Sequence, residues 1–304
     1  MPARIERRTR EHLAKHAHFA ALVPLAAPYH PVVIDLVDRI ERIVAPSGAR
    51  VLLHPEMRRL ERARATRIPL ISGGHTDTEM AFLVIDHVGL FVAAREGEAE
   101  HRGPLAPWVN ADIWPEGTAG IAGHAAWVEI ADLGFMRESA IEPLDSAFNR
   151  AAAVTAATLA VVDAAEALGV FWHPAKNALP PAAFAAQAGR VIRGEAPLAA
   201  WLRYLYLASD DDALAEGVVT KGLAAFTGHE IEVLPSLLPR EEARVLAFEF
   251  ARMVIDRGAV PRTGMIVSPS RQFSATVRVG ESRLHPGLAV YELTVSAPVA
   301  AAEE

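Results

Sequence analysis

Hydrophobic residues recur at two spacings along the chain, and the spacing predicts which segments are helices and which are strands. Apolar side chains three or four positions apart share one face of a helix, whereas alternate residues share one face of a strand. The helical spacing predicts four helices, over Pro31–Val44, Pro143–Leu168, Pro181–Ile192 and Pro239–Asp256. Gly169, Gly194 and Gly258 follow the last three, and glycine commonly stands just past a helix end.

Short apolar or alternating runs between these helices predict strands. Met80–Ile85 and Gly89–Ala94 are separated by Asp86-His87-Val88, a length typical of a hairpin. Further strands are predicted at Val51–Leu53, His124–Ile130, Val170–Trp172, Trp201–Ala208, Gly217–Thr220, Glu230–Leu234, Met265–Val267, Ala275–Val279 and Ala289–Val295. The Pro- and Gly-rich region Gly103–Gly123 contains Trp108 and Trp114, which predicts an ordered loop held by aromatic side chains.

The order of these elements indicates the fold class. Helices are interspersed among hairpins instead of alternating with single strands, which predicts an α+β fold with two lobes of largely antiparallel sheet and packed helices. We expect an N-terminal lobe over residues 31–195 and a C-terminal lobe over 196–296. Residues 1–30 are expected to form a basic N-terminal segment outside the lobes, as an exposed helix or a loose tail, and 297–304 a frayed tail.

Composition narrows the class of protein. The chain has 304 residues, of which 51% are hydrophobic and 22% charged, enough for a sizeable core. A net charge of −7 argues against a nucleic acid as the partner. The absence of cysteine excludes disulfides and thiolate chemistry and agrees with a reducing cytoplasm. No apolar run reaches the roughly 18 residues that span a bilayer, so we expect a cytoplasmic protein without membrane insertion.

One stretch of the C-terminal lobe carries a resemblance to a known family. Its residues are Thr220-Lys221-Gly222-Leu223, Phe226, Gly228 and Glu230-Ile231-Glu232-Val233. This pattern resembles that of bacterial proteins carrying the domain of unknown function numbered 4261, and agreement in order and character extends over most of residues 78–295. One departure is visible, because Thr227 stands where the family pattern has a glycine directly after the phenylalanine. The resemblance implies a fold and a bacterial cytosolic setting but no reaction.

Paired carboxylates stand within this stretch. Glu230 and Glu232 share one side of a predicted strand, where they could serve acid–base chemistry or face solvent. Their place in the motif favours a turn-anchoring or partner-binding role. We therefore predict a partner-binding site that comprises Thr220, Gly222, Phe226, Glu230 and Glu232.

A different segment offers candidate metal ligands. His75, Asp77 and Glu79 alternate along the chain, so an extended strand would place one imidazole and two carboxylates on one face, as a divalent ion requires. The simpler interpretation is a solvated start of the strand that becomes apolar at Met80. The strongest local positive charge comes from Arg58, Arg59, Arg62, Arg64 and Arg67. A surface that binds phosphate or nucleic acid has this character, but no aromatic residue is interleaved, which favours pairing with acidic groups of this protein or a partner.

Three functional hypotheses remain, and the third is binding of a nucleic acid or phosphate by the stretch from Arg58 to Arg67. The sequence contains no phosphate-binding loop, dinucleotide fingerprint or serine-nucleophile elbow, and no motif indicates a cofactor. The first hypothesis is therefore a non-enzymatic cytoplasmic bacterial protein that acts through protein–protein contacts, with an immunity or adaptor role beside a secreted toxin or secretion machine as one form. The alternative is a metal-dependent hydrolase that uses His75, Asp77, Glu79 and His124.

Overall fold

The computed structural model describes residues 18–30, 33–53, 78–97, 108–110, 114–133, 144–208, 216–236, 238–256, 258–268 and 274–296. Among the described residues, the chain divides between Ala200 and Trp201 into an N-terminal lobe and a C-terminal lobe, whereas the predicted boundary lies between residues 195 and 196. The predicted α+β class with two lobes of largely antiparallel sheet is confirmed.

The described part of the N-terminal lobe contains an antiparallel sheet with the strand order β2-β3-β4-β5-β1-β6-β7. Its strands are β1 (Ala20–Leu25), β2 (Val51–Leu53), β3 (Thr78–Ile85), β4 (Val88–Glu96), β5 (Ala126–Asp132), β6 (Val170–Trp172) and β7 (Asn177–Leu179). The predicted hairpin is β3–β4, and its turn contains only Asp86 and His87 because Ile85 already pairs with Val88. Asp86 adopts a φ of 52°, the left-handed conformation that such two-residue turns need.

The expectation that residues 1–30 lie outside the lobes is wrong from Ala20 onward. Residues Ala20–Leu25 form β1, a buried inner strand that pairs with β5 on one side and β6 on the other. The presence of Pro24 in the sequence argues against a central strand, because proline has no backbone N–H to donate to a neighbouring strand. The structure accommodates Pro24 because β6 pairs with β1 only at Ala21 and Leu22, before the proline.

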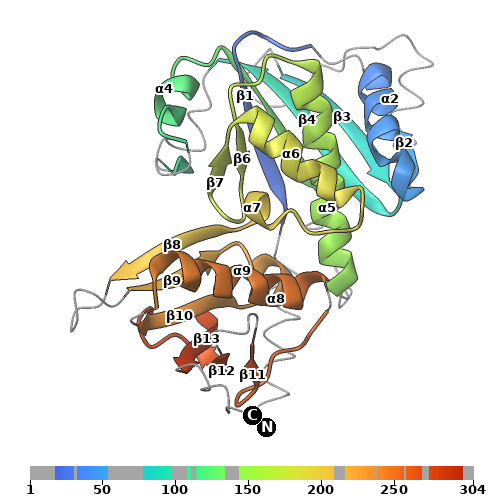
Figure 1. Cartoon of the computed structure of the whole chain (residues 1–304). Coiled ribbons are helices and arrows are strands. Elements are labelled where there is room, and N and C mark those ends of the chain that lie inside the picture. The colour runs from blue at the N-terminus through green and yellow to red at the C-terminus, as the bar shows by residue number, and fades with distance from the viewer. Residues whose placement is uncertain are drawn as a thin grey trace, which may run out of the picture. The chain divides into compact units, whose positions relative to one another are not determined.

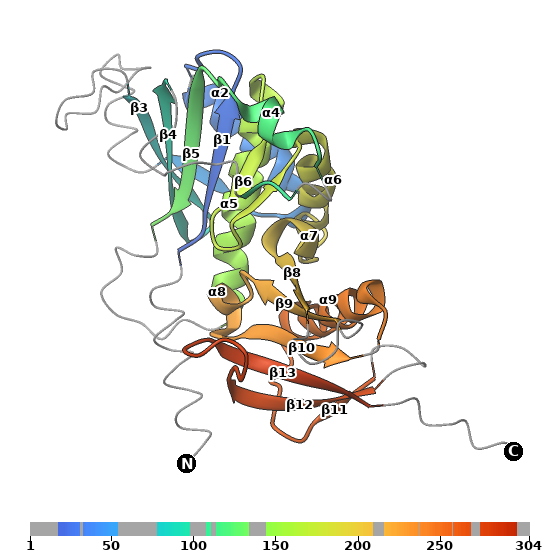
Figure 2. The ribbon, with the colours of Figure 1, turned by 90° about the vertical axis from the view of Figure 1, so that its left-hand side faces the viewer.

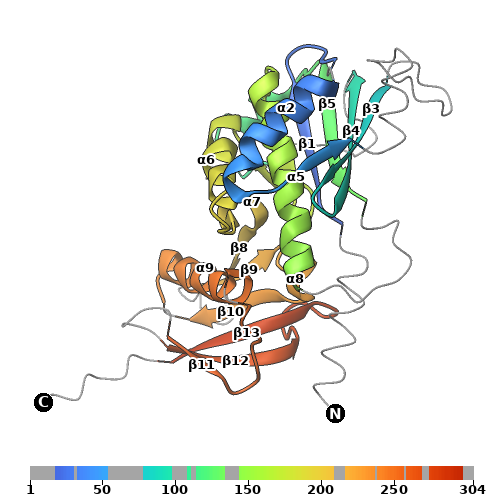
Figure 3. The ribbon, with the colours of Figure 1, turned by 90° about the vertical axis from the view of Figure 1, so that its right-hand side faces the viewer.

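Three helices cover one face of this sheet. These are α2 (Val33–Val44), α5 (Leu144–Ala164) and α6 (Pro181–Val191), and α5 contacts both of the others as well as β1, β4 and β5. Figure 3 shows them in front of the strands, and the opposite view in Figure 2 shows the strands in front. The short helices η1 (Ala45–Ser47), α4 (Gly117–Ile121) and α7 (Leu198–Trp201) complete the lobe among the described residues.

An aromatic cluster covers the second face of the sheet. Trp114 and Ile121, from the region predicted as an aromatic-pinned loop, pack with Leu22, Trp127 and Phe171 of the strands. The packing is close, because a Cβ added at Gly117 would lie 2.4 Å from the Trp114 ring. Both faces of β1, β5 and β6 are therefore buried, which explains why β1 and β6 are apolar runs without alternation, whereas β5 also contains the buried Glu129 and Asp132.

The C-terminal lobe has a second sheet, with the order β11-β12-β13-β10-β9-β8. Its strands are β8 (Arg203–Ala208), β9 (Glu216–Lys221), β10 (Glu230–Ser236), β11 (Ile266–Val267), β12 (Ser274–Glu281) and β13 (Ala289–Ser296). Only the β10–β13 pair is parallel among the described strands. The helix α9 (Arg240–Asp256) lies against β9 and β10 (Figure 1), and α8 (Ala224–Thr227) connects these two strands.

Alternation along β10 separates two different environments. Ile231 and Val233 are buried on the α9 face of the sheet, together with Tyr291, which contacts Phe250 of α9. Glu230 and Glu232 lie on the opposite face. The C-terminal lobe therefore places an apolar layer under α9 and carboxylates on the second face of the same strands.

Candidate functional site

Glu230, the first residue of β10, anchors the connection from β9. Its Oε1 accepts hydrogen bonds from the amides of Gly222 (2.8 Å) and Ala224 (3.2 Å). Its Oε2 accepts them from Thr220 Oγ1 (2.8 Å) and the amide of Leu223 (3.1 Å). Burial raises the pKa of the Glu230 carboxyl, although these four donors act in the opposite direction. The carboxylate thus fixes the path of the chain from Thr220 to Ala224.

The end of α8 shows why Thr227 can follow Phe226 directly, where the pattern of the family that the chain resembles has a glycine. Gly228 has a φ of 79°, and its amide donates to the carbonyl of Ala224 (2.9 Å), as is usual for the glycine that ends a helix. Thr227 still belongs to α8, and its hydroxyl donates to the carbonyl of His229 (2.9 Å). The left-handed position therefore falls on Gly228.

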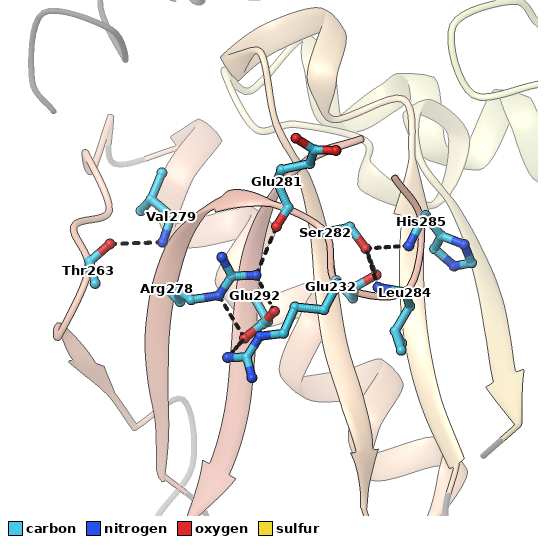
Figure 4. A network of polar contacts seen from close by, with 10 residues as sticks. Glu232, Thr263, Arg278, Val279, Glu281, Ser282, Leu284, His285 and Glu292 are labelled. Carbon is cyan, nitrogen blue, oxygen red and sulfur yellow. Dashed lines mark hydrogen bonds and ion pairs between the residues drawn. The ribbon is translucent and has the colours of Figure 1, made fainter. Parts of the chain in front are cut away.

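Glu232 lies two residues further along β10 and is completely buried. Its Oε1 accepts a hydrogen bond from Ser282 Oγ (2.7 Å), whereas its Oε2 has no partner among the described residues. Glu232 pairs in register with Glu292 of β13. Two carboxylates thus lie side by side within the second face of the sheet (Figure 4).

Two guanidinium groups compensate the charge of Glu292, which is also completely buried. Arg278 of β12 donates from Nε to Glu292 Oε1 (2.9 Å) and from Nη2 to Oε2, and Arg283 Nη2 donates to Oε1 (2.6 Å). The hydrogen bond from Arg278 lowers the pKa of the Glu292 carboxyl, and Arg283 adds to the effect. Glu292 is therefore a charged acceptor that fixes two arginines in place.

Ser282 connects the carboxylates to the exposed β12–β13 connection, residues 282–288, which we name the 282–288 loop. Its Oγ donates to Glu232 and accepts from the amides of Leu284 (3.0 Å) and His285 (2.8 Å). The amide of Gly287 donates to Glu281 Oε1 (2.7 Å). These bonds hold the backbone in one conformation, while the Leu284 side chain remains 45% exposed (Figure 4).

The five predicted partner-binding residues lie close together but inside the lobe. Thr220, Gly222, Phe226, Glu230 and Glu232 are all buried, and Phe226 stacks on Trp201 with ring centroids 5.1 Å apart. In this structure they hold the turn and the sheet, so a protein that approached the lobe would first meet exposed residues. The assignment of these five residues to a partner-binding site stays a prediction. The polar alternation of β10 does not mark a solvent-facing surface, because the carboxylates are buried beneath their own donors.

The predicted metal ligands fall largely outside the described residues. His75 and Asp77 lie outside them, as do Arg58, Arg59, Arg62, Arg64 and Arg67, and only the backbone of Glu79 is described, in β3. His124 is described, and its Nδ1 lies 3.1 Å from the carbonyl oxygen of Ile121. Within the described part of the chain, no three His, Asp or Glu side chains are grouped so that they could hold a metal ion.

Several contacts between polar residues of the interior could not be predicted from the sequence. Ser282 and Glu232 are fifty residues apart. In the N-terminal lobe, Asp132 accepts from Arg150 Nη1 (3.2 Å) and the amide of Phe19 (3.2 Å), and both charged side chains are buried. No local spacing connects such partners, and only the sheet register brings them together.

The chain was compared with known proteins, and neither a family model nor a curated protein nor a solved structure matches it. The resemblance to the family carrying the domain of unknown function 4261 stays a prediction. Among the helices of the described residues, none has the length and apolar character needed to cross a membrane.

Proposed function

We propose that this chain is a non-enzymatic bacterial protein of the cytoplasm, and that its C-terminal lobe binds a partner protein through the 282–288 loop. The observation that carries the proposal is the exposure of Leu284 on a backbone fixed by Ser282 and Glu281. Binding residues are often found on loops held by a rigid scaffold. The cytoplasmic setting is supported by the absence of cysteine.

The loop has the chemistry of a small protein contact. Leu284 supplies an aliphatic anchor, and the adjacent Arg283 side chain is 62% exposed while it contacts Glu292. Because the loop is already ordered, binding costs less conformational entropy than it would for a flexible segment. We expect a partner surface with an apolar recess bordered by carboxylates.

A second exposed apolar residue lies in the same lobe. Ile266 of β11 is 69% exposed and pairs in register with Thr276 of β12. Thr276 and Arg278 share one face of β12, so Ile266 lies on the sheet face that carries the Arg278–Glu292 contact. This face would extend the partner contact beyond the loop. An immunity or adaptor role is one form that such binding could take.

The experiment compares two matched variants. Leu284 and Val245 are 45% and 47% exposed, but Val245 lies on α9, on the opposite face of the sheet. Tagged wild-type, Leu284→Asp and Val245→Asp proteins are used for affinity capture from the native cells at low and moderate salt. We expect one stoichiometric protein partner with wild type and Val245→Asp, and its loss with Leu284→Asp. Equal capture by both variants would contradict the proposal.

The hydrolase hypothesis predicts a different result in the same preparations. A metal-dependent hydrolase would retain a stoichiometric divalent ion after purification without chelator, would lose it in a His75→Ala variant, and would turn over substrates in a broad hydrolase screen. That combination would replace the binding proposal.

A further inference from the structure

The N-terminal lobe contains a cavity of about 1040 Å³ that is independent of the 282–288 loop. The cavity is bounded by the end of α2, by η1, by the β3–β4 turn and by one side each of α5 and α6. These three helices are seen together in Figure 3. Pockets that bind small molecules typically have volumes of about 300 to 1,000 Å³, so this cavity is large enough for such a ligand.

Aliphatic side chains form most of the cavity wall. They come from α2, the hairpin and α6, and include Ile43, Val44, Val84, Ile85, Val191 and Ile192. The α5 wall presents Ala152, Ala153 and Ala156 at positions that share one helix face. Longer side chains at these positions would fill the space, so the alanines create the cavity.

Among the charged and polar residues of the wall, Arg150, Asp86 and Ser47 form contacts within the lobe, and His87 and Asn149 are exposed. Arg150 forms its ion pair with Asp132 (3.2 Å), Asp86 Oδ1 accepts from the amide of Arg50 (2.8 Å), and Ser47 Oγ donates to the carbonyl of Val44 (2.7 Å). Asp86 lies at an exposed position of the turn, and the buried Arg150 is already paired with Asp132. A charged ligand inside the apolar part of the cavity would therefore lose its hydration without an unpaired buried charge of opposite sign, which is costly. The backbone groups of a bound peptide would meet the same difficulty.

We propose that this cavity binds an uncharged, predominantly apolar small molecule. Burial of the ligand removes apolar surface from water on both sides, which is the main favourable contribution available at such a wall. A much smaller apolar cavity, of about 150 Å³, suffices for benzene in an engineered protein, so a cavity of this size accepts a considerably longer hydrocarbon.

The first experiment measures binding of an uncharged fluorescent probe, N-phenyl-1-naphthylamine, to the full-length protein. We expect saturable binding, with displacement by decan-1-ol at a concentration at least about tenfold lower than by decanoate, a ratio that corresponds to about 1.4 kcal/mol. Absence of saturable binding, or stronger displacement by decanoate, would overturn the proposal.

Two phenylalanine variants locate the site. Ala152→Phe fills the cavity from α5, whereas Ala186→Phe places the same ring on the exposed side of α6, away from the cavity wall. We expect Ala152→Phe to weaken probe binding at least about tenfold, and Ala186→Phe to bind as wild type does. If Ala152→Phe fails to fold, Val191→Phe tests the α6 wall. A folded cavity variant that binds the probe unchanged would refute the site.

Discussion

Both lobes pack a long helix against a largely antiparallel sheet, but they differ in what lies on the second face of that sheet. In the N-terminal lobe this face is covered by an aromatic cluster that includes Trp114 and Trp127. In the C-terminal lobe it carries Glu232 and Glu292 with their hydrogen-bond donors. The first arrangement depends on close packing, and the second on a set of charges and hydrogen bonds.

This difference has consequences for how each lobe responds to change. A core of aromatic rings is sensitive to lost volume and insensitive to pH, because none of its side chains titrates. The stability of a set of buried carboxylates depends on each hydrogen bond. A carboxylate oxygen that loses its donor stays buried, so the free-energy cost of its desolvation is no longer offset. Hydrogen exchange read by mass spectrometry can test this difference, because it assigns the effect of a substitution to residues of one lobe.

The largest effect is expected for Trp114→Ala. Trp114 is 5% exposed and contacts several residues of the aromatic cluster. Its removal should therefore cost about 3–5 kcal/mol of unfolding free energy. Exchange should accelerate in peptides of the N-terminal lobe. Trp108→Ala is the control, with a smaller effect expected because Trp108 is only half-buried. Equal acceleration in both lobes would show that the two do not respond separately.

Glu230→Gln should have the next largest effect. Each oxygen of Glu230 accepts hydrogen bonds from two donors. In either orientation of the glutamine amide, its NH₂ group would therefore face two donors and could accept from neither. We expect the free energy of unfolding to fall by about 2 kcal/mol as a result. The faster exchange should start in residues 220–230 of the C-terminal lobe.

The control for this variant is Glu241→Gln, at an exposed position on α9. Its ion pair with Arg244 lies at the surface, where such pairs contribute little to stability. We therefore expect the stability of Glu241→Gln to stay close to that of wild type. A Glu230→Gln protein as stable as this control would disprove the anchoring role.

The contributions of Glu292 and Glu230 to stability should have opposite pH dependence. The pKa of Glu292 is lowered in the folded state. Its contribution is therefore present above the unfolded value of about 4.3 and is lost as pH falls through the folded value. The stability difference between wild type and Glu292→Gln should shrink as pH falls from 7 to 3.

Glu230 provides the contrast to Glu292. Its pKa is raised in the folded state. The pH-dependent part of its contribution is therefore greatest below about pH 4.3 and is lost as pH rises through the folded value, while the four hydrogen bonds that the ionised carboxylate accepts remain at neutral pH. Denaturant unfolding of both glutamine variants at several pH values checks the two signs. A difference for Glu292→Gln that grows on acidification would contradict the assigned charge of Glu292.

The smallest effect on stability is expected for Leu284→Asp, although its effect on partner binding should be large. Leu284 is exposed. Its substitution should change the free energy of unfolding by less than about 0.5 kcal/mol, as is usual at the surface.

Ser282→Ala is the matched comparison within the same loop. It should lower the free energy of unfolding by about 1–2 kcal/mol, because Glu232 and two loop amides lose their partner. Thermal unfolding of the two variants measures this ranking, and the reverse order would argue against a loop held by Ser282.

Much of the fold could be predicted from local patterns. The helices α2, α5, α6 and α9 and the β3–β4 hairpin lie close to their predicted limits, since hydrophobic spacing and adjacent glycines act over a few residues. The strand β1 was not predicted. Its sequence follows a basic segment and contains Pro24, and only the limited pairing of β6 explains why proline is tolerated there.

The candidate sites were less accessible to prediction. The sequence placed Glu230 and Glu232 on one side of a strand, and their turn-anchoring interpretation agrees with the contacts of Glu230. It could not show that these carboxylates are buried, because burial depends on donors such as Ser282 that are distant along the chain. The cavity was also invisible, since alanines on α5 leave a hollow only where α2 and α6 pack beside them.

The positions of most elements, the α+β class, the net charge and the absence of thiol chemistry could be predicted, because each follows from residue identity or from spacing within one segment. The folded chain was needed to show which polar residues are buried together, which apolar residues remain exposed and where a cavity is left. These properties depend on sheet register and helix packing, which join residues far apart along the chain.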